Sequence, residues 1–291
     1  MKGKSAMSLQ VHFKQVDVFT DVSFMGNPVA VVLDGNGLST GQMQAIASWT
    51  NLSETTFVCT PSDPRADYRL RIFTPRSELP FAGHPTIGSA FAALESGIKP
   101  KNAGRLVQEC GRGLVSVYTD DNKLFFELPE PNIINASVDM TELACALGVD
   151  FNDIKASATV DVGAVWITLQ LPGAESVLKL KPDMSKLSAL IPAGVTGVTV
   201  FGLFSGNAES DIEVRSFAPT VGINEDPVCG SGNGCVATLV RKLNLFEKPG
   251  YIASQGKCTG RNGRVEVRFA DNGKILIGGH AVTCIDGILK I

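Results

Sequence analysis

The sequence FTPRSELPFAGHPTIGSAFAALE, residues 73–95, places a strand end, a glycine-containing loop and an apolar segment in immediate succession. Its last part, residues 86–95, is apolar on almost every side, which predicts a buried helix. Residues 217–243, FAPTVGINEDPVCGSGNGCVATLVRKL, repeat this order, with residues 234–243 as the predicted helix. The two strand–loop–helix units decide the fold prediction.

Other segments repeat at nearly the same spacing. The two units begin 144 residues apart (217 − 73), and Val16-Asp17-Val18 recurs as Val160-Asp161-Val162 at the same offset. Residues 113–117, GLVSV, resemble residues 263–267, GRVEV, at an offset of 150. Chance similarity among β-rich segments is the alternative, but three matches in one order indicate a duplication.

The pattern therefore predicts an α+β protein of two similar halves, residues 1–130 and 131–291. Each half is expected to be a mostly antiparallel, curled sheet around a central apolar helix, with a small-molecule site in the cleft between them. The last strand is a candidate for crossing back to the first half. Further helices are predicted at residues 40–50 and 141–147. Strands are predicted at residues 11–19, 27–33, 68–73, 114–118, 123–128, 160–171, 197–204, 212–217, 264–269 and 274–277.

Composition excludes several classes of function. The 26 basic and 29 acidic residues are evenly scattered, which argues against nucleic-acid or membrane partners. Seven cysteines without a CxxC pair and only three histidines argue against a metal site. No signal-peptide pattern begins the chain, so a cytoplasmic location is expected. No GxGxxG or GxxxxGK[ST] motif occurs, which argues against a dinucleotide or phosphate-loop cofactor.

The two glycine loops carry the candidate site residues. A helix N-terminus presents free N–H groups and a positive dipole end, both of which favour an anion such as a carboxylate. The first loop supplies His84, and the second supplies Asp226, Cys229 and Ser231. Either loop alone is more typical of an ordinary helix cap, but together the two loops supply a dense set of proton-transfer groups, which favours a site.

Several motifs together resemble the PhzF family of phenazine-biosynthesis isomerase-like proteins. They are GNPVAVV (26–32), NLSETTFV (51–58), FTP (73–75), ELPFAGHP (78–85), SFAP (216–219) and EDP (225–227). The resemblance implies the fold of diaminopimelate epimerase and proline racemase, a homodimer, and no cofactor. In the best-understood member of the family, a proton shift isomerises a dihydro-hydroxyanthranilate.

The resemblance also implies roles for individual residues. Glu54 of the NLSET motif matches the family's acid/base, and His84 and Asp226 match its other catalytic positions. The backbone around Gly83, Gly230 and Ser231 would hold the substrate carboxylate. The family usually has Thr where this chain has Cys229, so this loop looks closer to that of the related racemases. Those enzymes use two cysteines, one in each half. This chain has Cys229 at the second-half position but Ala82 at the first-half position.

We therefore expect a cofactor-independent isomerase that moves a proton on a small carboxylate, with Glu54 as acid/base. One alternative is an α-carbon epimerase or racemase that uses Cys229 as second base, with Glu54 or His84. Another is a catalytically silent binding protein on the same fold. The sequence does not identify the substrate, because no motif marks the side chains of the cleft wall.

Overall fold

The computed structural model describes residues 9–206 and 208–291, so the first eight residues of the predicted N-terminal half lie outside the described residues. In the first half, the helices are α1 (Thr40–Thr50) and α2 (Gly83–Glu95). The strands are β1 (Gln10–Val18), β2 (Asn27–Val32), β3 (Thr55–Cys59), β4 (Tyr68–Phe73), β5 (Glu78–Leu79), β6 (Arg105–Cys110), β7 (Gly113–Asp120) and β8 (Lys123–Glu127).

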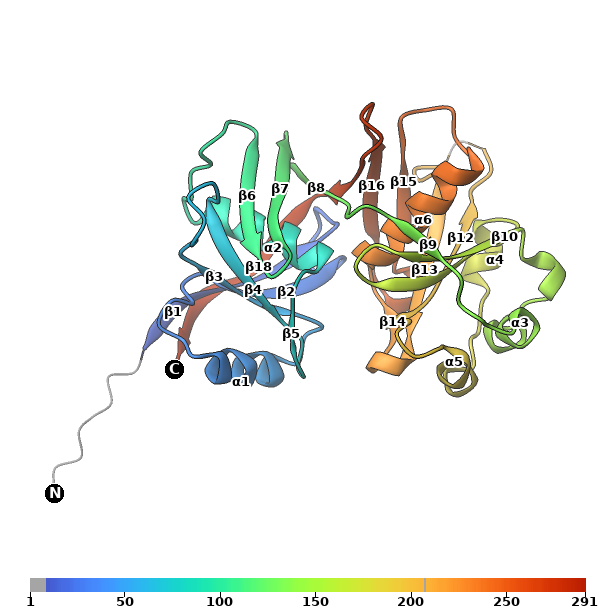
Figure 1. Ribbon diagram of the computed structural model, residues 1–291, viewed down its shortest axis with the longest axis horizontal. Coiled ribbons are helices and arrows are strands. Elements are labelled where there is room, and N and C mark those ends of the chain that lie inside the picture. Colours follow the sequence, from blue (N-terminus) through green and yellow to red (C-terminus); the bar gives the residue numbers. More distant parts are fainter. Residues whose placement is uncertain (1–8, 207) are drawn as a thin grey trace, which may run out of the picture.

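In the second half, the helices are α3 (Met140–Leu147), α4 (Ala174–Leu178), α5 (Met184–Leu190) and α6 (Gly230–Leu243). The strands are β9 (Asn132–Ile134), β10 (Ala156–Asp161), β11 (Val165–Gln170), β12 (Gly197–Leu203), β13 (Ile212–Ala218), β14 (Ile223–Asp226), β15 (Gly250–Gln255), β16 (Gly263–Phe269), β17 (Ile275–Gly279) and β18 (Ala281–Lys290). Figure 1 shows the two halves side by side, with α2 inside one and α6 inside the other.

The two halves repeat one pairing pattern. In the first half, β2–β3 and β4–β6 are parallel, and the other pairs from β1 to β8 are antiparallel. In the second half, β11–β12 and β13–β15 are parallel, and the other pairs from β10 to β17 are antiparallel. Val16 and Val160 lie in the equivalent strands β1 and β10. The predicted duplication and fold class are confirmed.

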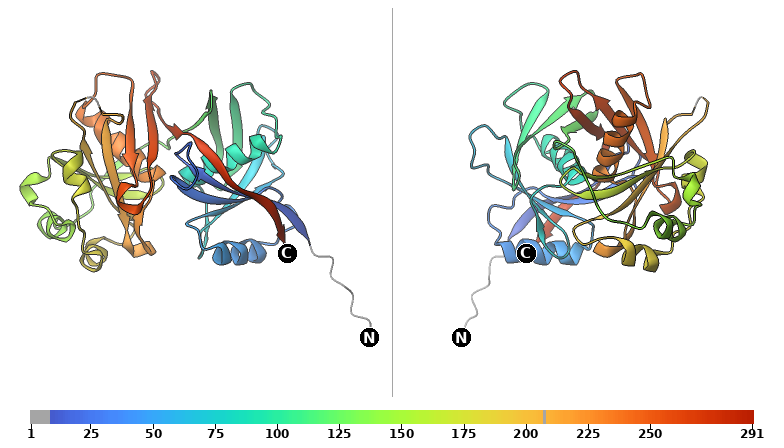
Figure 2. Two further views of the ribbon diagram at one scale, coloured as in Figure 1. Left: turned by 180° about the vertical axis from the view of Figure 1, so that it is seen from behind. Right: turned by 45° about the vertical axis from the view of Figure 1, so that its right-hand side comes forward.

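The last strand runs back to the beginning of the chain. β18 pairs antiparallel with β1 along its whole length, and Figure 2 shows it crossing from the second half to the first. The two halves are also joined directly, because β17 pairs antiparallel with β8. The division of the chain at residue 130 stays a prediction.

The central helices are buried because their residues are small and apolar. In α2, Ile87, Ala90 and Ala92 are fully buried, and Val236 and Ala237 of α6 are equally inaccessible. These side chains belong to one continuous core that extends through both halves. Packing of this kind fixes the position and direction of each helix, and with it the position of each helix N-terminus.

The two central helices, α2 and α6, start earlier than predicted, whereas α1 does not. α1 has the predicted bounds, and its N-cap Ser39 forms a capping box with Gln42. α2 begins at Gly83 rather than Thr86, and α6 begins at Gly230 rather than Gly234. Gly83, His84, Gly230 and Ser231 therefore lie in the first helical turns rather than in loops. The predicted strand at residues 160–171 is in fact the β10–β11 hairpin.

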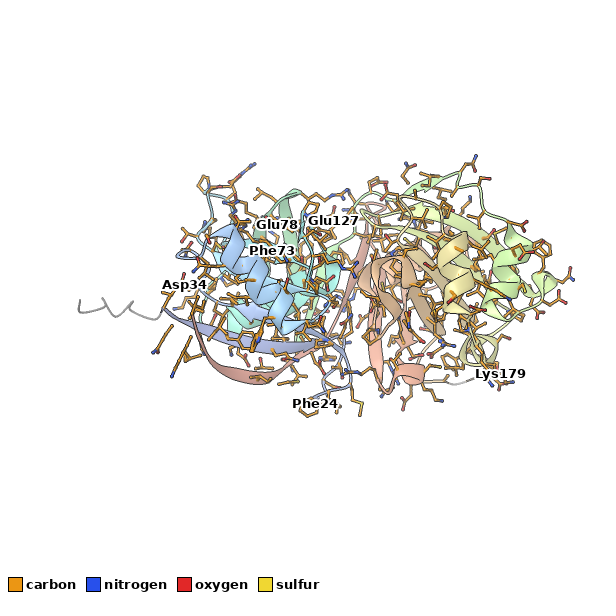
Figure 3. All side chains as sticks on the ribbon, turned by 90° about the horizontal axis from the view of Figure 1, so that it is seen from below. Phe24, Asp34, Phe73, Glu78, Glu127 and Lys179 are labelled. Carbon is orange, nitrogen blue, oxygen red and sulfur yellow. The ribbon has the colours of Figure 1, made fainter. Side chains whose placement is uncertain are left out.

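A smaller core lies beneath α1. Met43 and Ala47 of this helix pack with Phe57 and Phe73, whose rings meet edge to face with centroids 5.5 Å apart. Phe73 is labelled in Figure 3, which views the molecule from the side of α1. This packing holds α1 against β3 and β4, and so fixes the turn that follows the helix.

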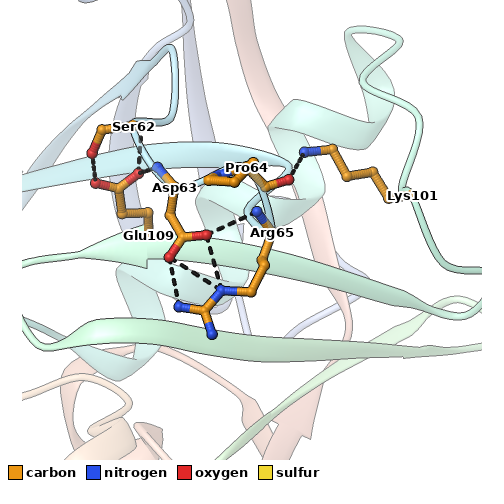
Figure 4. A network of polar contacts seen from close by, with 6 residues as sticks. All are labelled: Ser62, Asp63, Pro64, Arg65, Lys101 and Glu109. Atoms are coloured by element: carbon orange, nitrogen blue, oxygen red, sulfur yellow. Dashed lines mark hydrogen bonds and ion pairs between the residues drawn. The ribbon is translucent and has the colours of Figure 1, made fainter.

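A surface network ties the β3–β4 loop to β6 (Figure 4). The amides of Ser62 and Asp63 donate to Oε2 of Glu109 at 2.6 and 3.0 Å. The ammonium of Lys101 donates to the Pro64 carbonyl at 2.8 Å. These bonds order a loop on the surface of the first half. Within the part of the chain that the structure describes, no helix is long and apolar enough to cross a membrane.

Candidate active site

The N-termini of α2 and α6 meet at the junction of the two halves. A Cβ atom on Gly230 would lie only 3.2 Å from the backbone nitrogen of His84, so the glycine permits this close approach. A Cβ on Gly83 would lie 2.7 Å from the ring of Phe126. The two positive dipole ends together make this junction favourable for an anion.

Glu54 and His84 face each other beside these helix ends. Glu54 lies in the turn between α1 and β3, where Asn51 ends α1 with a left-handed φ of 55°. Its Oε2 is 3.3 Å from Nε2 of His84, and the side chains are 15% and 7% exposed. Neither atom has a hydrogen-bond partner among the described residues, so the two groups are close but not aligned for a bond.

Burial shifts the pKa values of the ionisable groups at this junction. Desolvation raises the pKa of Glu54 from 4.5 to about 7, although a hydrogen bond from Ser53 opposes the shift. Desolvation lowers the pKa of His84 from 6.5 to about 4, against the attraction of the Asp226 charge. At neutral pH, Glu54 therefore exists in both protonation states while His84 is neutral.

Asp226 joins the site from the second half and is held by the first. Asn27 of β2 donates from Nδ2 to Oδ1 of Asp226 at 3.0 Å and to the Val228 carbonyl at 2.9 Å. Burial raises the pKa of Asp226 to about 6, His84 lowers it, and Glu54 raises it. The pKa of Asp226 therefore depends on the charges of both His84 and Glu54.

Cys229 acts as the N-cap of α6. The Gly232 amide donates to its Sγ at 3.2 Å, and Oγ of Ser231 lies 3.7 Å from the sulfur. Burial, together with the charge of Asp226, raises the pKa of the thiol well above its usual value. The side chain is therefore a neutral thiol at physiological pH in this arrangement.

Three residues that the sequence analysis did not single out support the second helix end. One is Asn27, which donates to Asp226 and to the Val228 carbonyl. Trp166 of β11 donates from Nε1 to Oγ of Ser231 at 3.0 Å. Gln255 of β15 donates to the Asp226 carbonyl at 3.0 Å and accepts from the Cys229 amide at 3.1 Å. Asn27 lies in the GNPV motif, which could have drawn attention to it, whereas the other two lie in strands without a motif.

All the predicted site residues converge at this junction. Glu54, His84 and Gly83 come from the first half, and Asp226, Cys229, Gly230 and Ser231 come from the second. Their catalytic and binding roles stay predictions. Among the described residues, no group of three or more His, Cys, Asp or Glu side chains is arranged to hold a metal ion.

The side chains of Glu54 and His84 are largely buried at this junction. Two cavities of about 280 and 350 Å³ are lined by other residues, and Glu54, His84 and Asp226 line neither of them.

Comparison with known proteins identifies close relatives. Residues 16–287 match the family model PhzC-PhzF, described as phenazine biosynthesis-like protein. Antisense-enhancing sequence 1 of Schizosaccharomyces pombe is 44% identical over 94% of this chain and 97% of its own length. Trans-2,3-dihydro-3-hydroxyanthranilate isomerase of Pseudomonas chlororaphis is 33% identical over 94% of this chain and 96% of its own.

Solved structures share the fold. The Bacillus anthracis phenazine biosynthesis protein of the PhzF family superposes with a TM-score of 0.85 at 24% identity, covering 97% of this chain and 100% of that one. A probable proline racemase from Agrobacterium radiobacter has a TM-score of 0.65 at 15% identity, covering 97% and 92%. The likeness to the racemase confirms the predicted relation between the two folds.

Proposed function

Because the chain belongs to the PhzC-PhzF family of phenazine biosynthesis-like proteins, we propose that it is a cofactor-independent isomerase with Glu54 as its acid/base. The observation that carries the proposal is the environment of Glu54. Its carboxyl is buried, has a pKa of about 7, and lies 3.3 Å from a neutral histidine. A group with a pKa near the working pH both accepts and returns a proton readily.

The proposed substrate is a small molecule with a carboxylate. The N-cap of α2 is Ala82, which offers no side-chain acceptor to the first amides of the helix. The amides of Gly83 and His84, with those of Gly230 and Ser231 opposite, are therefore suited to bind a carboxylate. Such binding would set the α-carbon of the substrate between Glu54, His84 and Asp226.

In the proposed reaction, ionised Glu54 removes a C–H proton that the bound carboxylate or an adjacent double bond makes acidic. The helix N-terminal amides stabilise the negative charge that develops. Glu54 then returns the same proton to another carbon on the same face, so no atom or electron is gained or lost. Neutral His84 is close enough to relay the proton, and Asp226 orients the substrate from the second half.

The geometry is less favourable for a two-base epimerase that uses Cys229. Such an enzyme needs a thiolate, whereas burial and Asp226 raise the pKa of this thiol. A catalytically silent binding protein is also less well supported, because Glu54, His84 and Asp226 are all present and mutually close.

The family resemblance further leads us to propose a cytoplasmic homodimer. All seven cysteines are free thiols, which is typical of a reducing compartment. Sedimentation velocity of the purified protein tests the dimer, and a monomer at micromolar concentration would contradict it.

The function is tested by incubating the protein with small amino and aromatic carboxylates, including trans-2,3-dihydro-3-hydroxyanthranilate. Thermal shift reports binding, and product analysis in D₂O reports the reaction. A double-bond or proton shift in the product supports an isomerase. Deuterium at the α-carbon with inverted configuration indicates the epimerase instead. Binding without either change indicates a silent binding protein.

A further inference from the structure

Two polar side chains, those of Glu213 and Ser254, lie together on the outer face of the second-half sheet, away from α6. Glu213 of β13 and Ser254 of β15 are register partners, so their side chains share one face of the sheet. The Ser254 hydroxyl donates to Oε2 of Glu213. The next residue, Gln255, reaches Asp226 and Cys229 on the opposite face. Glu213 and Ser254 therefore lie on the face away from the candidate active site, and Gln255, which also lines the cavity beside Glu213, lies between the two sites.

A cavity of about 280 Å³ opens beside Glu213. Leu178 of α4 and Phe204, which follows β12, form an apolar part of its wall. Its size suits a small metabolite rather than a nucleotide or a peptide.

The side chain of Glu213 has fewer hydrogen-bond partners than that of its buried neighbour Arg215, two residues along β13. Arg215 donates to both carboxylate oxygens of Glu225, at 2.9 and 2.8 Å, and to the Val177 and Leu180 carbonyls. Glu213 is 2% exposed, and its Oε1 has no hydrogen-bond partner within the described ranges 9–206 and 208–291. A buried carboxylate oxygen without a donor is destabilising, which is expected where a ligand supplies the donor.

Three cations surround the rest of the cavity. They are Lys257, Arg261 and Arg264, whereas Glu213 is the one acidic residue among the described residues that line it. Nη1 of Arg261 is anchored by the carbonyl of Phe24, a residue labelled at the molecular edge in Figure 3. The ion pair of Arg264 is weak, because its partner Glu209 is 3.5 Å away and 91% exposed. The excess positive charge favours an anionic group.

We propose that this cavity binds a small aliphatic amino carboxylate, as a site separate from the candidate active site. The ammonium group of the ligand donates to Glu213, and its carboxylate lies against Lys257 and Arg264. The aliphatic side chain packs on Leu178 and Phe204. A molecule with only one of the two charges satisfies only one end of the cavity, so both charges are required for tight binding.

Calorimetric titration of the full chain with L-leucine, 4-methylpentanoate and isopentylamine tests the proposal. Leucine is expected to bind at least about tenfold more tightly than the other two, which each lack one charged group. Glu213→Gln keeps an acceptor for Ser254 but loses the charge, and should weaken leucine binding about tenfold. Lys257→Gln, at an exposed position, should weaken it as well. Glu175→Gln, at an exposed glutamate of α4, is the matched control and should bind normally.

Three outcomes overturn the proposal. The first is the absence of saturable leucine binding by the wild type. The second is equal binding of the single-charge analogues. The third is leucine binding that survives both Glu213→Gln and Lys257→Gln but is lost in Glu54→Gln, which would assign the ligand to the candidate active site. None of these outcomes depends on whether the protein is an isomerase, so failure here leaves the proposed function untouched.

Discussion

Nε2 of His84, at the start of α2, lies 3.3 Å from Oε2 of Glu54, in the turn after α1. Both groups are buried in the same low-dielectric surroundings, which favour the uncharged form of each. The pKa of the acid rises while that of the base falls, so the pair does not form a stable salt bridge at neutral pH. A carboxyl group that has a pKa near 7 and forms no salt bridge is well suited to exchange protons with a ligand.

The shifted pKa of Glu54 makes the free energy of unfolding depend on pH. A carboxyl whose pKa is raised on folding stabilises the folded state below its unfolded pKa of 4.5, and this contribution is lost as the pH rises through about 7. Glu54→Gln should therefore be more stable than the wild type at pH 8, by up to roughly 3 kcal/mol. Urea denaturation at several pH values measures the difference, which should disappear near pH 4.5. If the difference in the free energy of unfolding were the same at every pH, the raised pKa of Glu54 would be contradicted.

Cys229→Thr should fold and retain most of the isomerase activity. The threonine hydroxyl can accept the Gly232 amide as the thiol does, so stability should change by no more than about 1 kcal/mol. Thermal denaturation and turnover of the identified substrate check both expectations. Loss of turnover by a folded Cys229→Thr protein would instead indicate that the thiol takes part in the chemistry.

Asn27→Ala should weaken the connection between the halves. Two buried hydrogen bonds, to Asp226 and to the Val228 carbonyl, are lost, and the expected destabilisation is about 1–3 kcal/mol. Asn135→Ala, at an exposed asparagine after β9 whose side chain makes no hydrogen bond to the described residues, is the matched control and should be nearly neutral. Chemical denaturation of the three proteins gives the comparison, and equal stabilities would contradict the cross-half link.

Gly230→Ala should disturb the contact between the two helix ends. Its Cβ would lie 3.2 Å from the backbone nitrogen of His84, a tight contact that a shift of a few tenths of an ångström between the two helix starts relieves. Gly41→Ala, in α1, adds a methyl group where no atom lies within 4 Å and should be neutral or slightly stabilising. Substrate KM and turnover should change in the first variant and remain constant in the second.

Much of the fold is predictable because the sequences of the two halves repeat the same segments in the same order. The recurrence of Val16-Asp17-Val18 and of the Phe73 segment indicated equivalent strands, and the structure confirms both. The sequence pattern predicts starts for α2 and α6 that are three or four residues too late, since glycine and proline normally weaken a helix. In the first turn, however, Pro85 needs no amide partner, and burial of the whole helix outweighs the poor propensity of the glycines.

The supporting contacts of the candidate site were beyond sequence reasoning. Asn27 and Asp226 are 199 residues apart and come from different halves. Gln255 reaches its partners only because β15 pairs in parallel with β13, a register that no local pattern specifies. The family motifs marked Glu54, His84 and Asp226 one by one, whereas their mutual distances depend on how the two halves dock.

The most direct measurement is the rate of isomer formation by Glu54→Gln, compared with the wild type at pH 7 on the identified substrate. The amide preserves the shape of the side chain but cannot accept a proton. The rate should fall by about 10²–10⁴, the usual contribution of a general acid/base, while substrate affinity is maintained and the variant is at least as stable as the wild type. An unchanged rate in the folded variant would show that another group moves the proton.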